Sequence, residues 1–148
     1  TVGAARQAVF QGISAIAIST VHSSSESDFN YQTAAEVVRE LVLNKKHEIT
    51  SMPECSLLNI NVPNLASDQV GKIVWTRPQM RRYTEEVFER TDQKGRQYFW
   101  IGGYPGVVEA RECSDHFAVM NGDISFSLLN LLNYSSDVYE EWVNKFSD

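Results

Sequence analysis

The chain has 148 residues and a formal net charge of −6, with hydrophobic residues making up 43% and charged residues 22%. This composition is typical of one globular domain or of a large part of a bigger one. The acidic balance argues against binding to nucleic-acid polymers, because neutralising phosphates requires a basic face. No apolar run reaches the roughly 20 residues of a membrane span.

The N-terminal segment has the pattern of a helix followed by a buried strand. Apolar residues recur at helical spacing over residues 2–12, and Gly12 is placed to end the helix. Residues 14–19 are apolar without polar alternation, which is typical of a strand buried in a parallel sheet. Together they predict half of a βαβ unit. Because the first residues already have a helical pattern, we expect the chain to be a piece of a longer polypeptide.

A polar loop and an amphipathic helix follow. Residues 21–30 are rich in serine and are expected at the surface, with Asp28 placed to cap the next helix. Apolar residues at i, i+4, i+7 and i+8 from Ala34 predict that helix. The basic segment Lys45–His47 would close it at the negative end of the helix dipole.

The rest of the chain is predicted to be mostly β-structure. Short apolar or alternating runs at 57–62, 72–76, 84–90, 97–101 and 124–128 predict strands. The third and fourth of these flank a turn sequence at 92–95 and predict a β-hairpin arm. A terminal amphipathic helix is predicted over residues 137–147.

Composition and spacing alone show no catalytic constellation. The histidines (His22, His47 and His116) have no second metal-ligand type at a metal-site spacing, so we expect them to be solvated or structural. The two cysteines, Cys55 and Cys113, form no paired motif and are expected to be small core residues. Their free thiols fit a reducing compartment and therefore a cytoplasmic location.

Three local features could nevertheless contact a ligand or a partner. The helix start Thr1-Val2-Gly3 offers a hydroxyl and backbone N–H groups that suit a phosphate, although any ordinary helix start looks similar. The arginines Arg77, Arg81 and Arg82 could contact a phosphorylated ligand or, as we favour, acidic residues of a partner subunit. Four aromatic residues within 98–104, among them Tyr98 and Trp100, could pack on the chain's own core or form a subunit interface.

Taken together, these segments resemble the SurE survival-protein family. Thr1–Ala5, followed by Gly12-Ile13 and Ile16–Ser19, is similar to the family's helix and strand, Ser-Gly-Thr-Val-x-x-Ala and Gly-Ile-Pro-x-Ile-Ala-x-Ser. Further blocks resemble its Leu-Leu-Asn-Val-Asn-Val-Pro strand, its Thr-Arg-x-x-x-Arg-x-Tyr arm and its Tyr-Trp-Ile-Gly-Gly segment. These blocks lie at 57–63, 76–83 and 98–103, and a last one with Ser114-Asp115 and 122–125 follows. The chain departs from the family at two places. It has Ser14 where the family has proline, and Ser-Leu-Leu at 127–129 where the family has Thr-Pro-Leu.

The resemblance implies part of a Rossmann-like, three-layer α/β domain with a β-hairpin arm and a swapped C-terminal segment. Residues 1–75 would be the C-terminal half of that domain. Residues 76–148 would hold the arm, the late strand and the terminal helix used for oligomerisation. Arg77, Arg81, Arg82, Tyr98 and Trp100 would then be contacts of a homo-oligomer, a dimer or a tetramer.

The resemblance also implies a 5'-nucleotidase, a metal-dependent phosphatase that acts on nucleoside monophosphates. Its divalent ion, Mg or Mn, would be held by residues upstream of Thr1, so that no catalytic or metal-binding residue is expected within this chain. Thr1, Val2 and Gly3 would face the phosphate. The alternatives are a non-catalytic oligomerisation protein or truncated relative, and a nucleotide-binding module without hydrolysis.

Overall fold

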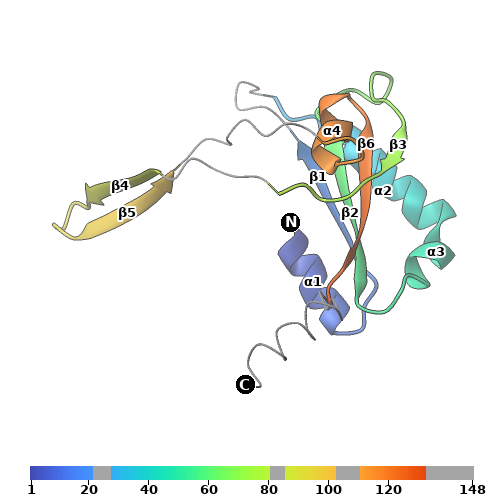
Figure 1. The fold of residues 1–148 in the computed structure, drawn as a ribbon, viewed down its shortest axis with the longest axis horizontal. Helices are drawn as coiled ribbons and strands as arrows, with labels where there is room; N and C mark the ends of the chain where they lie inside the picture. The colour runs from blue at the N-terminus through green and yellow to red at the C-terminus, as the bar shows by residue number, and fades with distance from the viewer. Residues whose placement is uncertain (22–27, 81–85, 103–110, 133–148) are drawn as a thin grey trace, which may run out of the picture.

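The computed structural model describes residues 1–21, 28–80, 86–102 and 111–132 (Figure 1). Its centre is a mixed four-stranded sheet in the order β1-β2-β6-β3. The strands are β1 (Ile16–Val21), β2 (Ser56–Pro63), β3 (Ile73–Trp75) and β6 (Ile124–Asn130). β1 and β2 are parallel, β2 and β6 are antiparallel, and β6 and β3 are parallel. Strand β6 belongs to the predicted segment 76–148, yet it lies in the sheet between β2 and β3, which belong to the predicted segment 1–75.

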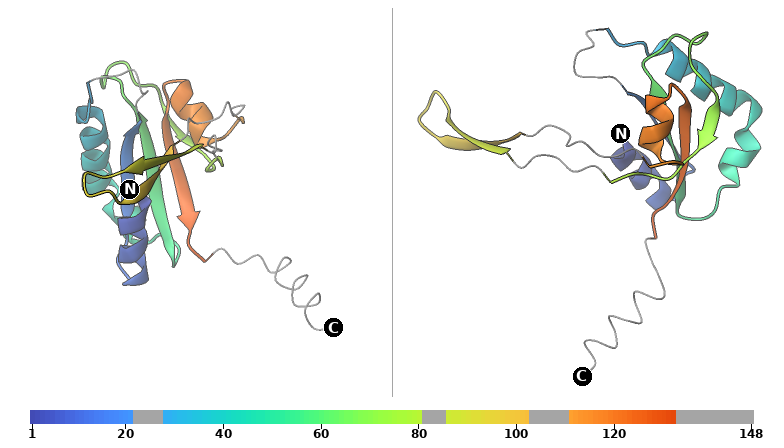
Figure 2. Two further views of the ribbon diagram at one scale, coloured as in Figure 1. Left: turned by 90° about the vertical axis from the view of Figure 1, so that its left-hand side faces the viewer. Right: turned by 45° about the horizontal axis from the view of Figure 1, so that its top comes forward.

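Helices cover both faces of this sheet, so the described part has three layers (Figure 2). On one face lie α2 and α3, and on the other lie α1 and α4. Their bounds are α1 (Val2–Phe10), α2 (Gln32–Asn44), α3 (Lys46–Thr50) and α4 (Asp115–Met120). The α/β expectation and its parallel β1–β2 pair are confirmed.

The hydrophobic core is divided between the two faces because successive strand residues point to opposite sides. Leu58, Ile60 and Val62 of β2 pack with Phe126 of β6 and Ala34 of α2 in the larger cluster. The smaller cluster joins Ala5 of α1 to Ala17 and Leu57, and the small alanine side chains let the helix lie close to the sheet.

Of three predictions about helix ends, one is confirmed and two are wrong. Gly12 has a φ of +76°, the left-handed conformation that ends α1, as predicted. The predicted helix from Ala34 to His47 is instead two helices, because α2 ends at Asn44 and His47 lies in α3. Asp28 does not cap α2: its N-cap is Tyr31, and the Asn30 side chain accepts a hydrogen bond from the Gln32 N–H at 3.1 Å.

Both cysteines are free, but the expectation that they are core residues is wrong. Cys55 is half-buried and Cys113 is exposed. They lie in the turns that precede β2 and α4, with φ values of 56° and 65°. Their positions are thus determined by turn geometry rather than by packing of the sheet.

The hairpin arm is the second β-structure, formed by β4 (Glu86–Thr91) and β5 (Gln97–Gly102). Its turn is closed by a hydrogen bond from the Gly95 N–H to the Asp92 carbonyl at 3.0 Å. The Asp92 carboxylate accepts the N–H groups of Lys94 and Arg96 and forms an ion pair with the Arg96 side chain. Gly95 has a φ of +78°, which explains why the predicted turn sequence needs glycine there.

Candidate functional site at the carboxyl edge of β1 and β2

The start of α1 meets the carboxyl end of β1. Because β1 and β2 are parallel, their carboxyl ends lie at the same edge of the sheet, which is where ligands bind in open α/β sheets. At this edge the Ser19 hydroxyl donates a hydrogen bond to the Thr1 hydroxyl oxygen at 3.0 Å. Ser19 is also paired in register with Asn61 of β2. The structure therefore brings a predicted site residue, Thr1, together with Ser19, to which the sequence had assigned no role.

The first turn of α1 has N–H groups that no side chain caps. Thr1 is its N-cap, but the Thr1 side chain makes no capping hydrogen bond to the helix. A Cβ atom added to Gly3 would meet no heavy atom within 4 Å. The N–H groups at a helix start carry the positive end of the helix dipole, so this turn can bind a phosphate group.

A row of polar side chains continues from this edge across the sheet, on the face that carries α1 and α4. We call it the polar row; it consists of Asn59, Asn61, Thr76, Ser125 and Ser127. Asn61 is paired in register with Ser125, and Asn59 with Ser127. Both serines are fully buried, and Asn59 is only 9% exposed.

The hydroxyl of Thr76 holds the polar row together. Its oxygen lies 2.7 Å from the Ser125 hydroxyl oxygen and 2.8 Å from that of Ser127. It also donates to the Phe126 carbonyl at 3.2 Å. Because buried hydroxyls are costly without partners, this network explains how β6 tolerates two serines in the interior.

The loops beyond this edge are held by asparagine side chains. The Asn64 side chain accepts from the Asn30 N–H at 2.7 Å and donates to the Asp28 carbonyl at 2.8 Å. The hydroxyl of Thr33, at the start of α2, donates to the Leu65 carbonyl at 2.7 Å. These contacts fix the chain after β2 against the segment before α2, so the edge has a defined shape.

The described residues at this edge do not fit a divalent cation by themselves. Its groups are the hydroxyls of Thr1 and Ser19 and the amide of Asn61, whereas hard divalent ions prefer a set that includes carboxylates. No group of three or more His, Cys, Asp or Glu side chains in the described ranges could hold a metal ion. The Asp115 carboxylate on α4 is already engaged as an acceptor of the Gln79 N–H at 2.9 Å.

The expected oligomer contacts are only partly within the described residues. Tyr98 and Trp100 lie on β5 and are 43% and 64% exposed. Arg77 is exposed, and its backbone bonds to Cys113 and Asp115 tie the base of the arm to the start of α4. Arg81, Arg82 and the predicted helix at 137–147 lie outside the described residues.

Comparison with known proteins agrees with this architecture. The profile of the family described as "Survival protein SurE" matches residues 1–85. The chain belongs to the SurE family. Among the described residues, no helix is long and apolar enough to cross a membrane.

Relatives with the name SurE cover nearly all of this chain. The protein described as "5'-nucleotidase SurE" from Geobacter sulfurreducens is 36% identical over 148 residues, which is 96% of this chain and 54% of the relative. The protein of the same description from Legionella pneumophila is 34% identical over 132 residues, 88% of this chain and 50% of the relative. The chain thus spans about half the length of the curated relatives it matches.

A solved SurE structure shows the same fold. The crystal structure of the SurE protein from Aquifex aeolicus aligns with a TM-score of 0.71 and 29% sequence identity. The alignment covers 100% of this chain and 57% of that one. The overall fold described above is therefore shared with a solved SurE protein.

Proposed function

We propose that this chain is one part of a 5'-nucleotidase that hydrolyses nucleoside 5'-monophosphates. Water would attack the phosphorus atom, the bond to the ribose 5' oxygen would break, and the products would be a nucleoside and inorganic phosphate. The single observation that carries the proposal is the Thr1–Ser19 hydroxyl pair at the uncapped start of α1. The description of the SurE relatives as 5'-nucleotidases supports it.

Thr1, Val2 and Gly3 would face the phosphate in this proposal. The N–H groups of the first turn would bind its oxygens, and Ser19 would hold the Thr1 hydroxyl in place for the same purpose. A divalent ion, Mg or Mn, would supply the charge that polarises the phosphoryl group. Because the described edge offers no carboxylate set, the ion's ligands would come from residues upstream of Thr1 in a longer protein.

The arm supports a second part of the proposal, a homo-oligomer. All of β4 and all but the last residue of β5 are exposed, including Phe99 and Trp100 at 63% and 64%. An isolated two-stranded hairpin is only marginally stable in water, and large exposed aromatic groups are typical of protein interfaces. Arg77, Tyr98 and Trp100, with Arg81 and Arg82, would contact a second copy of the chain in a dimer or tetramer.

The free thiols of Cys55 and Cys113 suit a cytoplasmic location.

A chimaera tests the proposed activity. The chain is joined to the part of the Geobacter sulfurreducens relative that lies outside the aligned region, and phosphate release from AMP is measured with and without Mn²⁺ or Mg²⁺. We expect release that depends on the divalent ion. A folded chimaera that releases no phosphate would instead favour a non-catalytic assembly protein, and saturable AMP binding without release would favour a binding module.

Variants of the hydroxyl pair test the role of the helix start. Thr1→Val and Ser19→Ala should each lower kcat/KM of the chimaera by about tenfold, the value of one lost hydrogen bond. In Thr1→Val the lost bond is the one to the phosphate, and in Ser19→Ala it is the one that positions the Thr1 hydroxyl. Thr91→Val, which removes an exposed hydroxyl on the arm, serves as the matched control. Full activity of both pair variants would contradict the assignment of Thr1 to the phosphate.

A further inference from the structure

A cavity of about 840 Å³ lies on the opposite face of the sheet from α1. It is bounded by α2, α3 and the strands β2, β3 and β6. Its size is in the range of small-molecule sites, roughly 300–1,000 Å³. The phosphate-facing helix start and the polar row are on the other face, so this cavity is separate from the site described above.

The floor of the cavity is apolar and partly open to water. Leu41, Met52 and Phe126 line its inner part, where they join the larger core cluster. Trp75 packs edge-on against Phe126, with ring centroids 5.8 Å apart, yet remains 66% exposed. Ile73, also in the lining, is 53% exposed. The apolar part of a ligand bound here would shield these large side chains from water, and the apolar side chains of the floor have no hydrogen bonds to lose.

The rim of the cavity is acidic. Glu36, Glu40 and Glu48 line it, together with a single cation, Lys45. Lys45 forms an ion pair with Glu48 at 2.9 Å, and Glu40 forms one with Arg39 at 3.1 Å. Two of the three carboxylates therefore already have a cationic partner.

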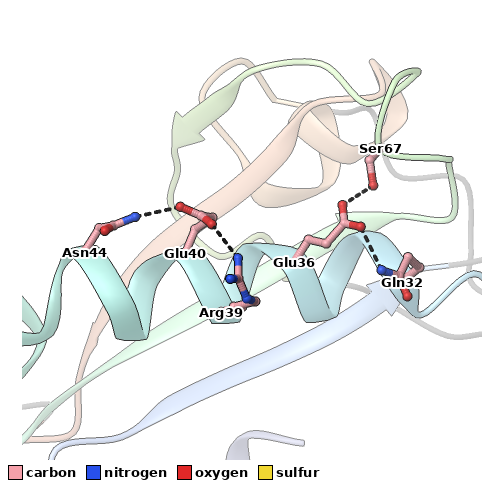
Figure 3. Close-up of polar contacts among 6 residues, drawn as sticks. All are labelled: Gln32, Glu36, Arg39, Glu40, Asn44 and Ser67. Atoms are coloured by element: carbon pink, nitrogen blue, oxygen red, sulfur yellow. Dashed lines mark hydrogen bonds and ion pairs between the residues drawn. The ribbon is translucent and has the colours of Figure 1, made fainter.

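Glu36 is held differently, as Figure 3 shows. Its carboxylate accepts one hydrogen bond from the Gln32 side chain at 2.7 Å and another from the Ser67 hydroxyl. Both donors are neutral, and within the described ranges no ion pair to Glu36 is found. These two bonds, that of Ser67 first, lower the pKa of the Glu36 carboxyl, a group that is ionised at neutral pH even at its ordinary pKa. The rim thus presents a negative charge that is held by two neutral donors beside an apolar cavity, with Arg39 acting on it only through space.

We propose that this cavity binds a small amphiphilic organic cation, with its apolar body over Trp75 and Phe126 and its ammonium group at Glu36. Charge complementarity decides the class of ligand: the acidic rim repels phosphates and carboxylates, and neutral apolar molecules leave the Glu36 charge unmatched. The cavity would accordingly reject the nucleotides expected on the other face.

The test compares three probes of nearly equal shape on the full chain. Phenylbutylamine, phenylbutanol and phenylbutyrate are titrated separately, and binding is followed through the NMR signals of the Trp75 indole and of the methyl groups of Leu41 and Ile73. We expect the amine to bind about fivefold more tightly than the alcohol, as for one partly screened ion pair. The acid should bind weakest, and added salt should weaken only the amine.

Matched variants locate the charge. Glu36→Gln should reduce the affinity for the amine to that for the alcohol, whereas Glu89→Gln, which removes a carboxylate on the arm, should change neither affinity. Equal affinities for the three probes, or shifts that do not involve the cavity, would overturn the proposal. Shifts of the cavity signals that grow with protein concentration in the absence of a probe would also overturn it, since they would assign the surface to a second copy of the chain.

Discussion

The two faces of the central sheet are built from the same strands but have opposite character. On β2, Leu58 and Ile60 belong to the apolar cluster under α2, whereas Asn59 and Asn61 belong to the polar row beside α1 and α4. On β6, Phe126 and Ser125 are divided in the same way. Strand alternation thus lets a single short segment stabilise the fold on one side and present hydrogen-bonding groups on the other. Neighbouring residues of one strand therefore stabilise the fold differently, by apolar packing on one face and by hydrogen bonds on the other.

The largest loss of stability is expected when a large side chain is removed from the apolar face. Ile60 is fully buried, so Ile60→Ala should lower the free energy of unfolding by about 2–5 kcal/mol. Asn61→Ala, the next residue but on the polar face and only half-buried, should cost at most about 1 kcal/mol. Urea unfolding of both variants checks the comparison. Similar losses for the two would show that the faces do not differ as the structure indicates.

A smaller loss is expected when the polar row loses its central hydroxyl. Thr76→Val keeps the shape of the side chain but leaves the Ser125 and Ser127 hydroxyls without this partner, which should cost about 1–3 kcal/mol in the same assay. Thr91→Val removes an exposed hydroxyl on β4 and should change stability little. If Thr76→Val were neutral, the polar row would have no structural role.

Local patterns predicted much of this fold. The alternation at 57–62 fixes which residues of β2 face each helical layer, and the turn sequence at 92–95 places the arm. Helix α4 was missed, because six residues are too few to show a helical period; its one signal is Ser114, whose hydroxyl accepts the Phe117 N–H at 3.1 Å. Likewise, nothing near Cys113 in the sequence indicates its left-handed conformation.

The candidate site was less predictable because its contacts join distant parts of the chain. Thr1 was a candidate from its place at a helix start, but its partner Ser19 belongs to the next strand. Thr76 was predicted only as the end of a strand and as the neighbour of Arg77, whereas its hydroxyl contacts serines about 50 residues away along the chain. The alternating serines of β6 and asparagines of β2 carried the signal, but only the register of the strands shows that they form one row.

The side chains of the arm are mostly exposed, so substitutions there should affect stability less than substitutions in the central sheet. Trp100→Ala should change the free energy of unfolding by no more than about 0.5 kcal/mol, as for a surface site. In the proposed oligomer the same change should weaken assembly, because buried tryptophans are often interface hot spots. Sedimentation velocity over a range of concentrations measures this, with Lys94→Ala at the turn of the same arm as the control. Assembly unaffected by Trp100→Ala would place the interface elsewhere.

The smallest effect concerns the rim of the apolar face and depends on pH. Hydrogen bonds from Ser67 and Gln32 lower the pKa of the exposed Glu36 carboxyl below its ordinary 4.5. A lowered pKa in the folded state means that the ionised group stabilises the fold above that ordinary value, and that this stabilisation disappears as the pH falls through the folded pKa. The stability advantage of the native chain over Glu36→Gln should therefore be constant near neutral pH and shrink below about pH 4.5. Gln32→Leu, which removes one of the two donors, should weaken this pH dependence. Unfolding curves collected between neutral and acidic pH measure it. If the difference in stability between the native chain and Glu36→Gln does not change over this range, the two hydrogen bonds do not form.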